Sequence, residues 1–145
     1  MGILTSLRIA GSALTAQRLR MDVTTSNIAN AQTTRTDDGG PYRRQSVVFT
    51  PLAISSGTDG SGAAGQNGAM GVEVSAIVQD AAPQRQVHDP THPDADANGD
   101  VAYPNMDLVT EMTDMMSANR AYEANVTVIS AVKNMAQRAI DIARI

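Results

Sequence analysis

The residues best suited to chemistry lie near position 95, where carboxylates are closely spaced. The run DADANGD at 94–100 resembles the first seven positions of a calcium-binding loop, in which alternate side-chain oxygens turn toward one ion. The twelfth position of such a loop needs glutamate but is Asn105, and Pro93 and Pro104 deny the loop its flanking helices. A turn-forming cluster of Asp, Asn and Gly explains the run better, so we expect no calcium site.

Two histidines in the same region raise the possibility of another metal site. His88 and His92 lie close to Asp89 and Asp94, but the segment is rich in proline and no helix aligns the four side chains. The chain has no cysteine, which excludes disulfides, thiolate ligands and a cysteine nucleophile. Carboxylates are spread along the sequence without a diagnostic pairing. We therefore predict no catalytic residue, no metal, no cofactor and no enzymatic activity.

Charge is unevenly distributed along the 145 residues. Residues 1–44 carry a net +3 and residues 45–145 a net −7, giving −4 overall. A basic start and an acidic remainder suit head-to-tail or lateral association, although both could simply be solvated faces. The overall acidity and the scarcity of stacking aromatics argue against nucleic acid as the partner of the arginines. Ion pairs between subunits are the better interpretation of these four residues: Arg18, Arg20, Arg43 and Arg44.

Neither a membrane span nor a cleavable leader is expected. No stretch of about 18 apolar residues occurs, so we predict no membrane insertion. The apolar runs of residues 1–21 are broken by Thr5, Arg8 and Ser12, unlike the continuous core of a signal peptide. If the protein leaves the cytoplasm, we expect a route without a cleavable leader.

The elements that must position these side chains begin with a long N-terminal helix, assigned to residues 1–30 and regular from residue 3. A stripe with four- and three-residue spacing lies on one side of it: Ile3, Leu7, Ala10, Leu14, Gln17, Met21, Thr24 and Ile28. Ala10 is small, and Gln17 and Thr24 are polar, which makes the seam weak. The helix should therefore need a partner surface.

The middle segment, residues 31–104, is predicted to be rich in short β structure and loops. A β-prone run at 44–52 should pair in an antiparallel hairpin with the alternating stretch 72–79, in which Ile77 is slightly out of pattern. Residues 55–71 hold six of the eleven glycines and read as a flexible loop between the two. Residues 83–104 contain four prolines and are expected to form an ordered turn region or loop.

The C-terminal segment, residues 105–145, is predicted to be a helix from 107 to 144, capped at its start by Asn105 or Asp107. Its stripe keeps the same spacing for five heptads: Leu108, Met112, Met115, Asn119, Tyr122, Val126, Ile129, Lys133, Ala136, Ile140 and Ala143. We expect a mainly α structure with a small β insert. In this single structural unit, the two terminal helices pair as a coiled coil.

A pair of helices would leave much of each apolar stripe uncovered. Residues 106–116 contain four methionines, which pack adaptably against several partners and are too apolar for open water. The sequence therefore predicts an oligomeric helical assembly. Physical reasoning alone leaves open whether that assembly is an open helical array or a closed, soluble coiled-coil adaptor.

Family motifs narrow this choice. The segment SALTAQRLRMDVTTSNIANAQTT at 12–34, with SNIAN at 26–30, resembles the N-terminal signature of the flagellar rod, hook and hook-associated axial proteins. The segment MDLVTEMTDMMSANRAYEANVTVIS at 106–130, with ANRAY at 118–122, resembles their C-terminal signature. The middle stretches at 33–49 and 89–109 are similar specifically to the proximal rod members of that family.

The resemblance implies a structural subunit of the flagellar basal-body rod, the periplasmic drive shaft that transmits torque for motility. It implies export by the flagellar type III apparatus without a cleavable signal peptide. The implied partners are other copies of the chain, other rod proteins, and proteins at the junction with the basal-body ring and export gate. A homo-oligomer is possible in isolation, and a soluble coiled-coil scaffold is the alternative.

The terminal helices are expected to stack side by side in the inner layer of the rod. The expected assembly interface consists of Leu7, Leu14, Met21, Asn27, Ile28, Asn30, Leu108, Met112, Met115, Arg120, Tyr122, Val126 and Ile129. Asn27 and Asn30 should bond free carbonyls at the end of the first helix or adopt the left-handed conformation that ends it. We expect Tyr122 on the buried seam, and both helices to be poorly protected from hydrogen exchange until assembly.

Overall fold

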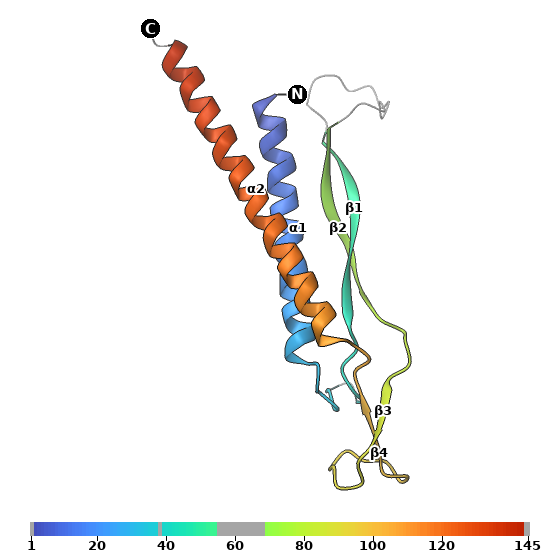
Figure 1. Cartoon of the computed structure of the whole chain (residues 1–145). Coiled ribbons are helices and arrows are strands. Elements are labelled where there is room, and N and C mark those ends of the chain that lie inside the picture. Colours follow the sequence, from blue (N-terminus) through green and yellow to red (C-terminus); the bar gives the residue numbers. More distant parts are fainter. Residues whose placement is uncertain (1, 38, 55–68, 144–145) are drawn as a thin grey trace.

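The computed structural model describes residues 2–37, 39–54 and 69–143, and it is long and narrow (Figure 1). Two helices account for about half of the described residues, α1 (Ile3–Ala29) and α2 (Leu108–Ala143). Four strands lie between them in sequence: β1 (Gln45–Ile54), β2 (Ala69–Gln79), β3 (Arg85–His88) and β4 (Asp100–Tyr103). The mainly α fold with a small β portion is thereby confirmed. Pairing of the helices as a coiled coil stays a prediction.

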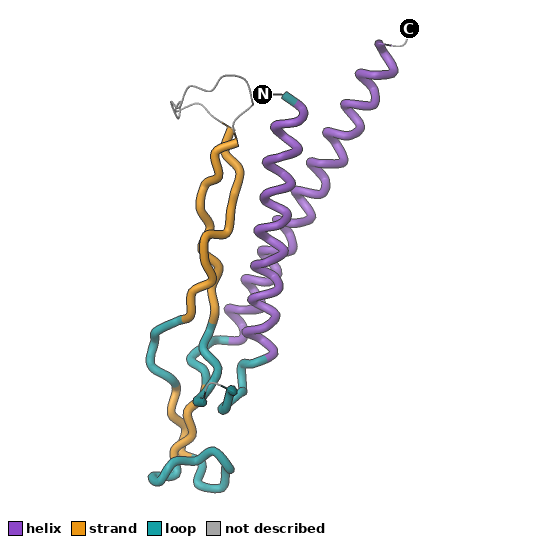
Figure 2. The backbone as a smooth tube through the Cα atoms, turned by 180° about the vertical axis from the view of Figure 1, so that it is seen from behind, coloured by secondary structure: helices purple, strands orange, loops and turns teal. Residues whose placement is uncertain are grey.

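Helix α1 is the central element of the molecule. It lies between α2 on one side and the β1–β2 hairpin on the other, as both views show (Figures 1 and 2). The two helices run in opposite directions, so that the start of α1 and the end of α2 lie at the same end of the molecule. Small residues allow this close packing, because Ala10 and Ala16 on α1 and Ala118 on α2 are all buried.

Local hydrogen bonds explain how α1 tolerates its threonines and where it ends. The hydroxyls of Thr24 and Thr25 donate to the carbonyls four residues earlier, at 2.9 and 2.8 Å. At the C-terminus, the Asn30 amide group donates to the Ser26 carbonyl at 2.9 Å. The Ser26 carbonyl also accepts a hydrogen bond from the Asn30 backbone amide at 3.1 Å, so Asn30 bonds a carbonyl of the last turn that is already paired. Its φ is −102°, which is not the left-handed conformation.

Strands β1 and β2 form the predicted antiparallel hairpin, longer than the sequence pattern suggested. Gln45 pairs with Gln79 at one end and Ile54 with Ala69 at the other, with a bulge between Val48 and Phe49. The bulge shifts the alternation of the ladder by one residue. Most of the expected glycine-rich loop at 55–71 lies outside the described residues, and β2 begins within that range.

The hairpin approaches α1 closely at Gly71, which is buried. A Cβ placed there would lie 2.6 Å from the Ser12 hydroxyl oxygen and 2.8 Å from the Ile54 Cδ1 atom. The same Ser12 oxygen accepts a hydrogen bond from the Val72 amide at 3.2 Å. A glycine in the strand thus lets the helix and the hairpin meet, and the hydrogen bond from Val72 to Ser12 joins them at this point.

The region 83–104 differs from the expected turn region, because it contains a second hairpin. Arg85 pairs with Tyr103 and His88 with Asp100 in a two-stranded antiparallel sheet. Each strand has only four residues, too few to show an alternating pattern among prolines and turn residues. Val101 is 1% exposed and forms the small core of this hairpin.

Helix α2 begins after a side-chain cap at Asp107, one of the two predicted capping residues. Its carboxylate accepts hydrogen bonds from the Val109 amide at 3.1 Å and from the Thr110 hydroxyl at 2.9 Å. The first part of α2 lies alongside α1, and its C-terminal part diverges from α1 in both views (Figures 1 and 2). Much of the second half of α2 therefore has no neighbour within the described chain.

Candidate assembly site

A buried asparagine near the end of α1 joins three elements of the fold. Asn27 is 1% exposed and uses all its hydrogen-bonding capacity. Its amide nitrogen donates to the Gln45 carbonyl at 2.8 Å and to the Glu111 carboxylate at 2.9 Å. Its amide oxygen accepts from the Gln45 amide at 3.0 Å and from the Tyr42 hydroxyl at 3.0 Å. Asn27 therefore fixes α1 to both β1 and α2. The expectation that its side chain caps the end of α1 is wrong, because that side chain is fully used by Gln45, Glu111 and Tyr42.

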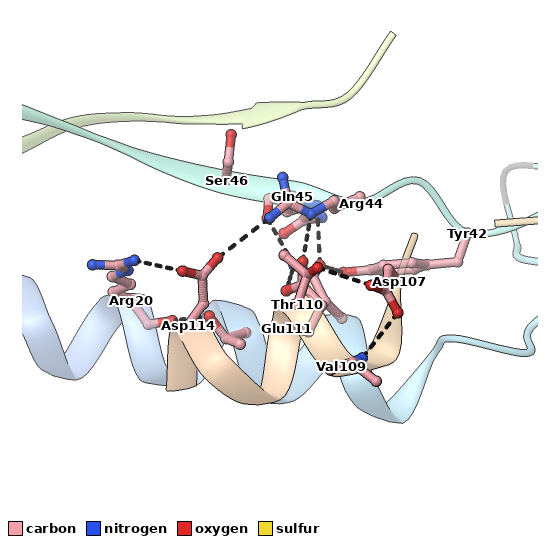
Figure 3. A network of polar contacts seen from close by, with 12 residues as sticks. Arg20, Tyr42, Arg44, Gln45, Ser46, Asp107, Val109, Thr110, Glu111 and Asp114 are labelled. Carbon is pink, nitrogen blue, oxygen red and sulfur yellow. Dashed lines mark hydrogen bonds and ion pairs between the residues drawn. The ribbon is translucent and has the colours of Figure 1, made fainter. Parts of the chain in front are cut away.

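Two carboxylates of α2 meet two arginines at the same place (Figure 3). Glu111 is 1% exposed, and its second oxygen accepts a hydrogen bond from the Arg44 guanidinium. Arg44 also lies 3.6 Å from Asp114, which pairs with Arg20 of α1 at 3.0 Å. We call the six residues of this network the polar junction: Arg20, Asn27, Tyr42, Arg44, Glu111 and Asp114.

The polar junction is a structural site, because each buried charge has a partner. A buried carboxylate is tolerated only when it is paired and hydrogen-bonded, and Glu111 meets both conditions. The sequence suggested Arg20 and Arg44 as partners in ion pairs between subunits, whereas here they pair with α2 of the same chain. Their guanidinium groups serve to hold α1, α2 and the start of β1 together.

The predicted interface residues of α1 lie in the interior or close to it. Asn27 is buried, and Leu7, Leu14 and Met21 are half-buried. Ile28 and Asn30, at the end of the helix, are also half-buried. A second buried row contains Ala16, Val23 and Asn27, which are seven and four residues apart. Helix α1 therefore has two covered sides, which a single stripe did not predict.

The predicted interface residues of α2 fall into two groups. Met115, Tyr122 and Ile129 are half-buried, so the structure brings these three into the inner part of the fold. Leu108, Met112, Arg120 and Val126 are exposed. The face of α2 that is covered by the chain consists of Glu111, Met115, Ala118, Tyr122, Asn125, Ile129, Val132 and Ala136.

This covered face keeps the predicted four- and three-residue spacing, with half of its positions displaced by one residue. It uses 111, 118, 125 and 132 where the apolar pattern selected 112, 119, 126 and 133. The pattern failed because it excluded a glutamate from the interior. The signal that could have identified Glu111 is its position, four residues before Met115 and seven before Ala118, in the same heptad register.

The displacement leaves apolar side chains on the surface of α2. We call five of these residues the outer face of α2. They are Leu108, Val109, Met112, Met116 and Val126, which are 45, 69, 52, 54 and 41% exposed. Val109, Met112 and Met116 are spaced three and four apart and so lie on one side of the helix. An exposed apolar surface that contains methionine is typical of a protein-binding site.

The carboxylates that suggested a calcium loop have separate partners within the chain. Asp94 accepts a hydrogen bond from Thr34 at 2.8 Å, and Asp100 lies 2.9 Å from the His88 ring nitrogen. Asp96 accepts from the Asn98 and Asp100 amides at 2.8 and 2.9 Å, which lowers the pKa of its carboxyl group. Among the described residues no group of three His, Cys, Asp or Glu side chains is arranged to bind a metal ion.

Neither helix in the described part of the chain has the length and apolar character needed to cross a membrane.

Two family models match the regions that form this site. The model for "Flagella basal body rod protein" matches residues 7–35, which contain nearly all of α1. The model for "Flagellar basal body rod FlgEFG protein C-terminal" matches residues 97–142, which contain β4 and nearly all of α2. The fold and the two matches together define a flagellar rod protein, in agreement with the family signatures in the sequence.

Relatives from several bacteria share almost the whole chain. The flagellar basal-body rod protein FlgC of Borreliella burgdorferi is 47% identical over 98% of this chain and 98% of its own length. FlgC of Bacillus subtilis is 44% identical over 96% of this chain and 97% of its own. FlgC of Salmonella typhimurium is 43% identical over 93% of each chain. The chain belongs to the FlgC family of flagellar basal-body rod proteins, and it is a structural protein of the basal body.

Proposed function

We propose that this chain is a subunit of the proximal rod, and that it assembles through its terminal helices into the periplasmic drive shaft that transmits motor torque. The observation that carries the proposal is the outer face of α2, whose apolar residues are 41–69% exposed. In a family of rod proteins, such a face is best explained as a contact between subunits. The chain has a structural role and no catalytic one.

The proposed interface combines residues of both helices. On α2 it includes the exposed residues Leu108, Met112, Arg120 and Val126, together with the half-buried Met115, Tyr122 and Ile129, which are partly covered by the rest of the chain. On α1 the proposed contacts are the half-buried Leu7, Leu14, Met21, Ile28 and Asn30. Asn27 contributes by positioning α1, since its side chain is occupied inside the chain.

The proposed partners follow from the place of a proximal rod subunit. They are further copies of this chain, other rod proteins, and proteins at the junction with the basal-body ring and export gate. Delivery by the flagellar type III export apparatus is part of the same proposal, and it is supported by the family signatures at 12–34 and 106–130. Nucleic acid is not a proposed partner.

The first test is mass spectrometry of hook–basal bodies extracted with detergent and washed harshly. Retention of the chain is expected for a rod subunit. Its absence from intact basal bodies would favour the soluble coiled-coil adaptor, whose closed oligomer would wash away.

The second test places a charge on the outer face of α2. We expect Met112→Asp to abolish swimming and incorporation into basal bodies while the isolated chain keeps its melting temperature, because residue 112 is 52% exposed before assembly. Ser117→Asp is the matched control, since Ser117 is an exposed residue on another side of α2. Normal incorporation of Met112→Asp would remove the outer face from the interface.

A further inference from the structure

The two faces of α2 that could turn toward α1 are almost equally apolar. They share Met115, Tyr122, Ile129 and Ala136, and they differ only at adjacent positions. The covered face adds Glu111, Ala118, Asn125 and Val132, whereas its neighbour would add Met112, Asn119, Val126 and Lys133. Burial of apolar area therefore does not select the observed face, and at the first of these positions it favours methionine over glutamate.

The contacts of Glu111 do distinguish the two faces. One of its oxygens accepts a hydrogen bond from Asn27 and the other from Arg44, in a place where the side chain is 1% exposed. With Met112 in that place, Asn27 and Arg44 would each lose an acceptor inside the fold. Buried donors that lose an acceptor are strongly unfavourable, and a single buried polar residue is known to fix the register of paired helices.

We propose that Glu111 is the residue that sets the rotation of α2 about its own axis, and so decides which face of α2 remains outside. In the observed rotation, Met112 and the rest of the outer face stay exposed. A rotation that turned the neighbouring face toward α1 would bury Met112 and Val126 and remove them from contact with other subunits. This inference rests on the proposed function, because the outer face is there assigned to assembly.

The test exchanges two neighbouring residues in the full chain, Glu111→Met together with Met112→Glu. The chain has no cysteine, so single cysteines report the rotation of α2 through their rate of labelling. In the parent, Ala118→Cys should react slowly and Asn119→Cys quickly, because Ala118 is 0% exposed and Asn119 is exposed. In the exchanged chain, the glutamate at position 112 should accept the hydrogen bonds from Asn27 and Arg44, which rotates α2. Cysteine at position 119 should then react slowly and cysteine at position 118 quickly.

We expect the ratio of the two rates to change by about tenfold or more, since labelling of a covered residue requires a transient opening. An unchanged ratio would overturn the proposal, whereas rapid labelling at both positions would mean that the exchanged chain does not fold. Ser117→Cys serves as the control, because residue 117 stays on the solvent side in either rotation.

A second variant covers the case in which the exchanged chain does not fold. Glu111→Ala leaves Arg44 paired with Asp114 and leaves Asn27 bonded to the Gln45 carbonyl. We expect it to fold and to lose its preference for one rotation, so that the ratio of labelling rates approaches one. A ratio equal to that of the parent would show that packing alone sets the rotation and would overturn the proposal.

The labelling experiment is independent of assembly, which separates the two hypotheses. If the exchange reverses the labelling order and cells swim normally, Glu111 sets the rotation and the outer face is not the rod interface. If the labelling order is unchanged while Met112→Asp blocks incorporation, the interface stands and the role of Glu111 is wrong.

Discussion

Asn27 and Glu111 lie 84 residues apart in the sequence and are joined by a 2.9 Å hydrogen bond in the interior of the molecule. One belongs to α1 and the other to α2, and the same asparagine also bonds both backbone groups of Gln45 at the start of β1. The relative placement of the three main elements thus depends on one amide side chain. Loss of that side chain should therefore destabilise the whole fold.

We expect Asn27→Asp to lower the free energy of unfolding by about 2–4 kcal/mol, because the carboxylate loses the donor and faces Glu111. Adding Glu111→Gln should recover part of the loss, since its amide group can donate to the new carboxylate. Thermal and urea unfolding of the four chains in this cycle measures the effect. Asn30→Asp is the control and should have a small effect; no recovery in the double variant would contradict a direct contact.

The close approach of β2 to α1 gives a second prediction. Gly71→Ala should destabilise the chain by about 1–3 kcal/mol, because the added Cβ would lie 2.6 Å from the Ser12 hydroxyl oxygen. Gly11→Ala, in α1, is the matched control, since nothing lies within 4 Å of its Cβ position and alanine favours the helix. Urea unfolding measures both, and equal stability of the two variants would contradict the close approach.

Hydrogen exchange of the isolated chain tests how the helices depend on assembly. The sequence predicts low protection in both helices, and the polar junction now predicts that protection is graded along them. It should be highest near Asn27 and Glu111, which are buried, and lowest in residues 133–142 of α2, where most side chains are exposed. Strong and uniform protection of both helices in a monomer would contradict the prediction.

The loop 89–100 should loosen in acid. Hydrogen bonds from the Asp100 and Asn98 amides lower the pKa of Asp96, and bonds from Thr91 lower that of Asp89. A lowered pKa means that the stabilisation is present above the pKa of the unfolded chain, about 4, and is lost as pH falls through the lower, folded value. The amide chemical shifts of Asn98 and Asp100 should report this loss as pH falls. Asp96→Asn should remove most of the pH dependence of these two shifts.

Much of this architecture could be predicted from the sequence. The periodic spacing predicts both helices to within a residue or two of their observed ends. The alternation at 72–79 predicts the first hairpin. The second hairpin was missed, because strands of four residues leave no detectable period. The family signatures led to the correct family, which the spacing of apolar residues alone could not define.

The polar junction was beyond sequence reasoning. Apolar periodicity assumes that charged residues lie outside, and Glu111 lies inside only because Arg44 and Asn27 are brought to it by distant parts of the chain. Asn27 was selected from a family motif, but its role was assigned to the end of α1. The contact between Asn27 and β1 depends on the path of residues 31–44 between the two elements. No pattern in the sequence predicts that path.

The unequal coverage of the two helices has a consequence for genetics. Helix α1 lies between the hairpin and α2 (Figure 1), whereas the residues of the outer face of α2 are 41–69% exposed. Substitutions that disturb the interior of α1 should reduce the amount of the protein found in cells. Substitutions on the outer face of α2 should leave that amount unchanged and produce a surplus of unincorporated chains. Immunoblots of whole cells and of purified basal bodies would therefore sort non-motile mutants into two classes, those whose chain is degraded and those whose chain accumulates without assembling.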